Sequence, residues 1–302
     1  MTSFNPPLEN NIGKFKSWVL ASRPKTLTAA VSPVLIGTSV AYYDNKINLI
    51  AALIALICSL LIQIGTNFVN DLYDHLKGSD SEDRVGPERA LAAGLISSNE
   101  MKYAIYLTFG VTFLLGLYLV YLAGWPILLV GVFSIASGYA YTAGPYPLAY
   151  NGLGDIFVFV FFGVVAVVGT YYVQALQLTE LIFISSIPAG TLITNILVTN
   201  NYRDIDEDSK NNKNTLAVKF GKQFSQVQYL LQLLIAYVVP VVIYFKYEIS
   251  WVVLLPLVTL PLGIYLFKML TNLKGEALNK TLELTAKLSV IFSILFSLGF
   301  LL

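Results

Sequence analysis

The sequence predicts an all-α, polytopic membrane protein. Of its 302 residues, 56% are hydrophobic and 12% are charged, whereas soluble domains carry about 25% charged residues. The apolar residues also gather in uncharged runs of about 20, which is the length that an α-helix needs to cross a bilayer. We therefore expect nine transmembrane helices that pack as one bundle in a lipid bilayer.

Nine apolar segments meet this length requirement along the chain. They are 24–43, 49–69, 101–122, 125–143, 154–175, 181–201, 226–246, 250–270 and 284–302. Prolines inside some of these runs are compatible with membrane helices, because neighbouring groups can satisfy the freed carbonyls. The expected organisation is a cytoplasmic N-terminal segment, 1–22, and a single domain over 23–302, with long polar connections at 70–100 and 202–225.

The distribution of positive charge predicts the orientation. With the N-terminus placed inside the cell, 17 of the 19 Lys and Arg residues fall on the cytoplasmic side, and the exceptions are Lys46 and Lys246. Cytoplasmic loops of membrane proteins show such an excess of Lys and Arg. The first 22 residues lack the pattern of a cleaved signal peptide. We expect a multi-pass protein of the cell inner (plasma) membrane, with both long connections in the cytoplasm.

Two acidic motifs lie at helix ends on this side of the membrane. The first has the spacing i, i+4, i+7 and the second i, i+4, i+8, and their members are Asn67, Asp71 and Asp74, and Asn200, Asp204 and Asp208. On a helix, each trio lies along one face. An ionisable side chain near hydrocarbon costs roughly 2.5–3.5 kcal/mol, so such a residue is a functional candidate.

Two facing carboxylate sets indicate a site for Mg²⁺ and a diphosphate. The carboxylates repel each other unless cations lie between them, and Mg²⁺ prefers oxygen ligands and bridges to substrate phosphates. Arginine forms bidentate phosphate contacts and lysine acts as a point charge. The candidate phosphate-binding cations are Arg84, Arg89, Arg203 and Lys213.

Aromatic residues around the connection between 125–143 and 154–175 suggest how a reactive substrate is handled. A diphosphate that leaves an allylic carbon creates a carbocation, which aromatic faces can stabilise without attacking it. The candidates in this region are Tyr139, Tyr141, Tyr146, Tyr150, Phe161, Phe162, Tyr171 and Tyr172. Of these, Tyr139 and Tyr141 are selected as substrate-binding residues, and most aromatic residues are expected to serve in packing. A dry chamber would keep water from the carbocation.

Single residues limit the other chemistries. Cys58 is the only cysteine, which rules out an intramolecular disulfide, and His75 is the only histidine, which argues against haem or His-ligated zinc. We expect His75 to be an exposed loop residue. The net charge of +1 carries no information about nucleic acid, and we expect no nucleic-acid partner.

Several motifs together resemble the UbiA superfamily of intramembrane aromatic prenyltransferases. The resemblance covers roughly residues 20–300 and rests on Asn70-Asp71-Leu72-Tyr73-Asp74 and on Asn200-Asn201-Tyr202-Arg203-Asp204. Gly169-Thr170-Tyr171-Tyr172 and Lys213-Asn214-Thr215-Leu216 are similar to the MenA branch, the 1,4-dihydroxy-2-naphthoate polyprenyltransferases. The family often has another Asp where this chain has Gly78, which leaves a role for Asp80 open.

The resemblance implies a nine-helix UbiA-type bundle and a specific reaction. A polyprenyl group passes from polyprenyl diphosphate to 1,4-dihydroxy-2-naphthoate, with loss of CO₂ and diphosphate, giving demethylmenaquinone in menaquinone biosynthesis. It also implies that Mg²⁺ is held by Asp71, Asp74, Asp204 and Asp208. Asn67 and Asn200 would orient metal or phosphate oxygens, and Arg84, Arg203 and Lys213 would clamp phosphate. No general base is assigned, although Asp74 is a candidate.

Two alternatives stay open at this point. The same fold could prenylate 4-hydroxybenzoate or homogentisate, and an assay with each acceptor distinguishes these substrates. A cation-coupled transporter could also use paired carboxylates, but transporters place them near the bilayer midplane. The motifs here lie at helix ends next to long charged connections, which favours the enzyme.

Overall fold

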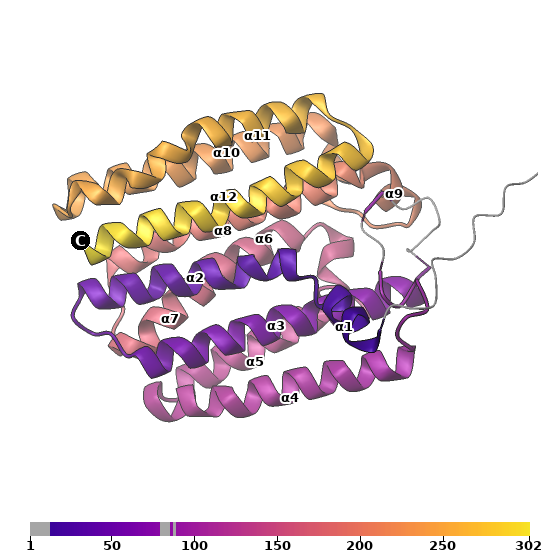
Figure 1. Ribbon diagram of the computed structural model, residues 1–302, viewed down its shortest axis with the longest axis horizontal. Coiled ribbons are helices and arrows are strands. Elements are labelled where there is room, and N and C mark those ends of the chain that lie inside the picture. Colours follow the sequence, from indigo (N-terminus) through magenta and orange to yellow (C-terminus); the bar gives the residue numbers. More distant parts are fainter. Residues whose placement is uncertain (1–12, 79–84, 87–88) are drawn as a thin grey trace, which may run out of the picture.

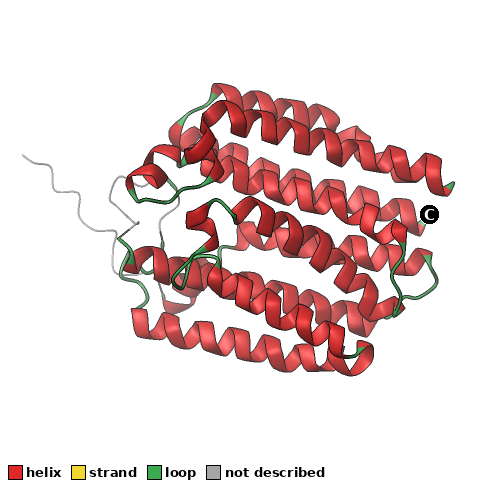
Figure 2. Cartoon of the chain, turned by 180° about the vertical axis from the view of Figure 1, so that it is seen from behind, coloured by secondary structure: helices red, strands yellow, loops and turns green. Residues whose placement is uncertain are grey.

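The structure is a computed structural model that describes residues 13–78, 85–86 and 89–302. Within these ranges the chain is helical and contains no strand (Figure 2). The helices, labelled in Figure 1, are α1 (Lys14–Ser22), α2 (Pro24–Tyr43), α3 (Leu49–Leu76), α4 (Ser98–Ala123), α5 (Trp125–Ala140), η1 (Leu148–Asn151), α6 (Gly154–Val158), η2 (Phe159–Val165), α7 (Ala166–Ala175), α8 (Glu180–Arg203), α9 (Ile205–Lys210), α10 (Leu216–Tyr247), η3 (Trp251–Thr259), α11 (Leu260–Asn272), η4 (Gly275–Ala277) and α12 (Leu278–Leu301).

The predicted membrane bundle is confirmed, with one short member. Eight helical stretches in the described part of the chain are long and apolar enough to cross a membrane. The ninth expected span corresponds to α5, which is apolar but has 16 residues. Two spans are composite: Gly154–Ala175 joins α6, the π-helical η2 and α7, and Trp251–Asn272 joins η3 and α11.

Helix α8 forms the centre of the bundle. Its most apolar 18-residue window is 72% buried, and α10, α12 and η2 pack around it, while α2 packs between α12 and α7. A Cβ atom on Gly163 of η2 would lie 2.7 Å from Cα of Gly190 on α8, so these two backbones approach closely. Small residues allow such contacts between membrane helices, where van der Waals packing drives association.

Both long polar connections contain more helix than predicted. Helix α3 continues to Leu76 rather than ending at 69, and two carboxylates of its last turns, Asp71 and Asp74, are buried within the protein. The connection expected at 202–225 contains α9 and the start of α10, which Thr215 caps by accepting from the Val218 amide at 3.3 Å. Gly221, with φ of 81°, bends α10 after its first turns. In Figure 1, α1 and α9 lie at one end of the bundle and the C-terminus at the other.

Candidate active site

A cavity of about 410 Å³ runs from the α9 end of the bundle into its apolar interior. Its polar end contains residues of both acidic motifs, and its inner part is lined by apolar residues of α3, α4, α5 and α7. The lining includes Arg23, Asn70, Asp74, Arg89, Tyr141, Tyr150, Asp155, Phe161, Phe162, Asn200, Asp204, Glu207, Asp208, Lys213 and, further inside, Cys58, Leu119, Ile127 and Val173.

The first motif meets the cavity through one side of α3. Asp74 lines the cavity and pairs with Arg89, whose Nη2 lies 2.6 Å from Oδ2, and both side chains are 8% exposed. Arg89 Nη1 also donates to the Asn70 carbonyl at 3.0 Å. Asn67 and Asp71 are buried, but they are not among the residues that line the cavity. Asn67 instead donates to the Ser22 carbonyl at 2.9 Å and so ties α3 to the junction of α1 and α2.

Tyr150 joins the first motif to the second. Its hydroxyl donates to Oδ1 of Asp74 at 2.7 Å, and its carbonyl accepts from the amide of Asn214 at 2.9 Å. The ammonium groups of Lys77 and Lys213 lie 4.0 and 6.0 Å from the centroid of its ring. These contacts place a tyrosine with its face toward two cations between the two acidic sets.

The second motif bends where α8 ends. Helix α8 stops at Arg203, so Asp208 belongs to the separate helix α9 rather than to one continuous helix. The Asp208 amide still donates to the Asp204 carbonyl at 2.7 Å, which keeps a near-helical path. As a result, Asn200, Asp204 and Asp208 all line the cavity.

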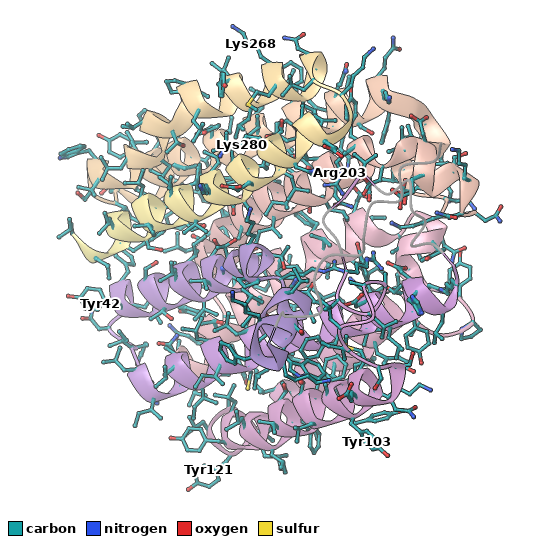
Figure 3. All side chains as sticks on the ribbon, turned by 45° about the vertical axis from the view of Figure 1, so that its right-hand side comes forward. Tyr42, Tyr103, Tyr121, Arg203, Lys268 and Lys280 are labelled. Carbon is teal, nitrogen blue, oxygen red and sulfur yellow. The ribbon has the colours of Figure 1, made fainter. Side chains whose placement is uncertain are left out.

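Each cavity-lining motif carboxylate has a cation partner from the protein. Arg203 donates to both carboxylate oxygens of Asp204, from Nε to Oδ1 at 2.6 Å and from Nη2 to Oδ2 at 2.7 Å. It also donates to Oδ1 of Asn200 at 2.9 Å. Figure 3 shows Arg203 within the bundle, whereas the labelled Tyr103 and Tyr121 project from its periphery. Lys213 donates to Asp208 Oδ1 at 3.0 Å. Of the three cations expected to clamp phosphate, the two that lie within the described residues, Arg203 and Lys213, are therefore engaged with carboxylates.

The polar end of the cavity carries excess negative charge. Among the described lining residues are five carboxylates, Asp74, Asp155, Asp204, Glu207 and Asp208, and three cations, Arg23, Arg89 and Lys213. Arg203, which pairs with Asp204, is a fourth cation, so one carboxylate remains in excess. Burial raises the pKa of Asp208, as do the charges of Asp204 and Asp74, while Lys213 opposes the shift. A trianionic diphosphate would add to this repulsion unless metal cations accompanied it.

This donor set suits Mg²⁺ that arrives with a phosphate ligand. In the described ranges, no group of three carboxylate, imidazole or thiol side chains is close enough to form a ready-made metal cage. Mg²⁺ usually keeps several waters and takes one or two carboxylates plus substrate phosphates, so it does not require such a cage. Asp74, Asp204 and Asp208 would be the protein ligands from the cavity wall.

The remaining predicted residues fall in different places. Arg84 lies outside the described residues, as does Asp80. Tyr141 lines the cavity, but Tyr139 is not among the lining residues, and its hydroxyl hydrogen-bonds to that of Tyr73. His75 is exposed.

Sequence reasoning missed Asn70 and Asp155 as cavity residues, and it gave Tyr150 no role beyond that of a candidate aromatic residue. Asn70 and Asp74 are four residues apart, so the usual i, i+4 rule would have paired them. Asp155 stands near the start of an apolar segment, as the acidic motif residues stand near the ends of theirs. The hydrogen bond of Tyr150 had no sequence signal, because Asp74 is remote in the chain.

Comparison with known proteins identifies the family. The model of the UbiA prenyltransferase family matches residues 30–291. The chain belongs to the UbiA prenyltransferase family. A 1,4-dihydroxy-2-naphthoate octaprenyltransferase of Haemophilus influenzae is 35% identical over 96% of this chain and 97% of its own length. An Escherichia coli protein of the same name is 40% identical over 71% of each chain.

Solved structures show the same UbiA fold. A UbiA homologue from Archaeoglobus fulgidus, solved bound to GPP and Mg²⁺, superposes with a TM-score of 0.68, covering 95% of this chain and 100% of that one. The two sequences are 17% identical, so this likeness concerns the fold. The UbiA-type helical bundle expected from the sequence is therefore confirmed, and the described part of the chain supplies eight long apolar stretches and the shorter α5 in place of nine full spans.

Proposed function

We propose that the chain transfers a polyprenyl group from a polyprenyl diphosphate to 1,4-dihydroxy-2-naphthoate, in menaquinone biosynthesis. The observation that carries this proposal is a single cavity with a carboxylate-rich end and an apolar interior. The carboxylate-rich end suits a metal-bound diphosphate, and the apolar interior suits a hydrocarbon tail. Relatives named for this reaction, 35–40% identical to this chain, support the choice of acceptor.

The bonds and electrons of this reaction balance without an added reagent. The C–O bond between the allylic carbon and the diphosphate breaks, and its electron pair leaves with the diphosphate. Ring electrons form a C–C bond at the carbon that bears the carboxylate, and CO₂ departs, leaving its bonding pair in the ring. The immediate product is the hydroquinone form, and demethylmenaquinone follows after a separate two-electron oxidation.

The protein's own residues would bind and shield the reactants. Asp74, Asp204 and Asp208 would hold Mg²⁺, which supplies positive charge to the departing diphosphate. Lys213 would contact the phosphate, and Asn200 would orient an oxygen ligand. Tyr141, with Phe161 and Phe162, would face the developing carbocation and exclude water. Asp71 and Asn67 stay predicted site residues, since they are buried beside the cavity, and Arg203 would reach phosphate only on releasing Asp204.

Membrane placement follows from the charge distribution. We propose that the α9 end of the bundle faces the cytoplasm of a bacterium and that the N-terminus lies on the same side. Lys and Arg concentrate in the N-terminal segment and in the polar connections 70–100 and 202–225, as is typical of cytoplasmic segments. The polyprenyl tail would then extend from this face toward the middle of the bilayer.

An acceptor assay tests the proposal. Purified protein in lipid receives a labelled polyprenyl diphosphate with 1,4-dihydroxy-2-naphthoate, 4-hydroxybenzoate or homogentisate, with and without EDTA. We expect a prenylated, decarboxylated product from the naphthoate, its loss on chelation, and its return with excess Mg²⁺. Asp204→Ala should be inactive and the exposed Asp206→Ala active. Product from 4-hydroxybenzoate alone would overturn the acceptor assignment, and substrate-coupled cation transport without product would favour a transporter.

A further inference from the structure

Asp155 is a cavity carboxylate that belongs to neither acidic motif. It lies in the first turn of α6, is 5% exposed, and lines the cavity. Gln228 of α10 donates to its Oδ1 at 2.9 Å. Unlike Asp74, Asp204 and Asp208, it has no Lys, Arg or His within ion-pair distance among the described residues. A buried carboxylate without a cation is costly unless polar hydrogens satisfy it.

The position of Asp155 is deeper in the bundle than that of the second motif. A Cβ atom on the adjacent Gly154 would lie 3.4 Å from Cδ2 of Leu197 on α8. Leu197 precedes Asp204 by seven residues, which corresponds to about 10 Å along a helix. Asp155 therefore lies on the apolar side of the diphosphate end, where the allylic carbon and the ring that attacks it must meet.

Tyr141 connects this level with the acidic motifs. Its hydroxyl lies 3.1 Å from the Cβ position of Gly154. Asp74, Asp155 and Asp208 line the same cavity as Tyr141. A planar aromatic substrate lying beside Tyr141 would have the diphosphate end on one side and Asp155 on the other.

We propose that Asp155 binds a ring hydroxyl of the aromatic acceptor and fixes the ring against the allylic carbon. This inference rests on the proposed function. Gln228 holds one carboxylate oxygen, and the hydroxyl donates to the carboxylate in a charge-assisted hydrogen bond. As the new C–C bond forms, the hydroxyl oxygen becomes electron-poor and its proton passes to Asp155. The proton returns when CO₂ leaves, so the reaction releases no net proton.

Steady-state kinetics of Asp155→Asn test this role, with the exposed Asp206→Asn as the matched control. The variant should raise KM for 1,4-dihydroxy-2-naphthoate by at least about tenfold, the usual effect of losing a hydrogen bond to a charged group. KM for the polyprenyl diphosphate should stay within about twofold, because that ligand is held by other residues. A purely structural role would not separate the two substrates in this way.

Two naphthoate analogues, each lacking one hydroxyl, provide a second measurement. The wild-type protein should bind the analogue without the recognised hydroxyl more weakly than the other, and Asp155→Asn should lose that discrimination. If Asp155→Asn does not fold, Gln228→Met removes the orienting amide and should raise the acceptor KM selectively. An unchanged acceptor KM in a folded variant, while the wild type makes product, overturns this inference alone. Absence of product from the wild type overturns the proposed function itself.

Discussion

Tyr150 and Asp74 are joined by a hydrogen bond of 2.7 Å between the phenol and the carboxylate. The carbonyl of Tyr150 also accepts a hydrogen bond from the amide of Asn214. The connection between α5 and α6 therefore contacts both the first acidic motif and the segment that follows the second, although the motifs come from opposite halves of the chain.

Replacing Tyr150 with Phe should weaken diphosphate binding. The variant keeps the ring beside Lys77 but removes a hydrogen bond to a charged group, which is worth roughly 1.5–3 kcal/mol. We expect KM for the polyprenyl diphosphate and the Mg²⁺ concentration for half-maximal rate to rise about tenfold or more. Titrations of both ligands measure this effect. Tyr103→Phe is the control, since that side chain is 76% exposed, and equal behaviour of the two variants would refute the linking role.

Removing Arg89 should destabilise the protein as well as inactivate it. Arg89→Ala leaves Asp74 buried without its ion-pair partner, a change that costs about 3–5 kcal/mol. Arg89→Lys should recover part of the stability, because it restores a charge but not both contacts that Arg89 makes with Asp74 and the Asn70 carbonyl. Thermal unfolding in detergent measures the difference. An Arg89→Ala protein as stable as the wild type would show that Asp74 finds another partner.

Asp208→Asn should stabilise the folded protein and lower its prenyltransferase activity. The folded-state pKa of Asp208 is raised, so its ionised form destabilises the fold above the unfolded-state pKa, and this penalty disappears as pH falls through the raised value. At neutral pH and without ligands, the Asp208→Asn protein should therefore unfold at a higher temperature than the wild type. Prenyl transfer should fall by on the order of 100-fold, as for lost electrostatic groups in active sites. A lower unfolding temperature of Asp208→Asn at neutral pH would contradict this expectation.

Gly190→Ala should disturb the packing of α8 against η2. The added methyl group would lie 2.8 Å from the Phe159 ring and 3.0 Å from its carbonyl oxygen. Overpacking of this kind costs about 1–3 kcal/mol. Gly110→Ala on α4 is the control, because nothing lies within 4 Å of its Cβ position. We expect Gly190→Ala to unfold at a lower temperature than Gly110→Ala, and equal unfolding temperatures would contradict this prediction.

The membrane-spanning helices were predictable from sequence because hydrocarbon demands long apolar runs, whereas the short helices α1 and α9 were not predicted. Hydropathy stops at 69, but α3 continues to Leu76, and Asp71 and Asp74 in its last turns are buried by other parts of the protein. Helical spacing correctly puts Asn67, Asp71 and Asp74 on neighbouring parts of one face. It does not give the rotation of α3 about its own axis. In the structure, Asn67 faces the junction of α1 and α2, where it donates to the Ser22 carbonyl, and it does not line the cavity.

The cation partners were harder to predict than the carboxylates. Acidic residues at membrane helix ends stand out because they are rare there. By contrast, Arg203 could equally contact phosphate or a neighbour, and only the folded chain reveals its two hydrogen bonds to Asp204. The same is true of Asp155, whose depth depends on how α6 meets α8.

Cys58 lines the apolar interior of the cavity, and it is the sole thiol of the chain. A fluorine-bearing thiol reagent would thus modify one atom in an otherwise native protein. Its resonance would report whether hydrocarbon occupies the inner compartment, independently of any turnover.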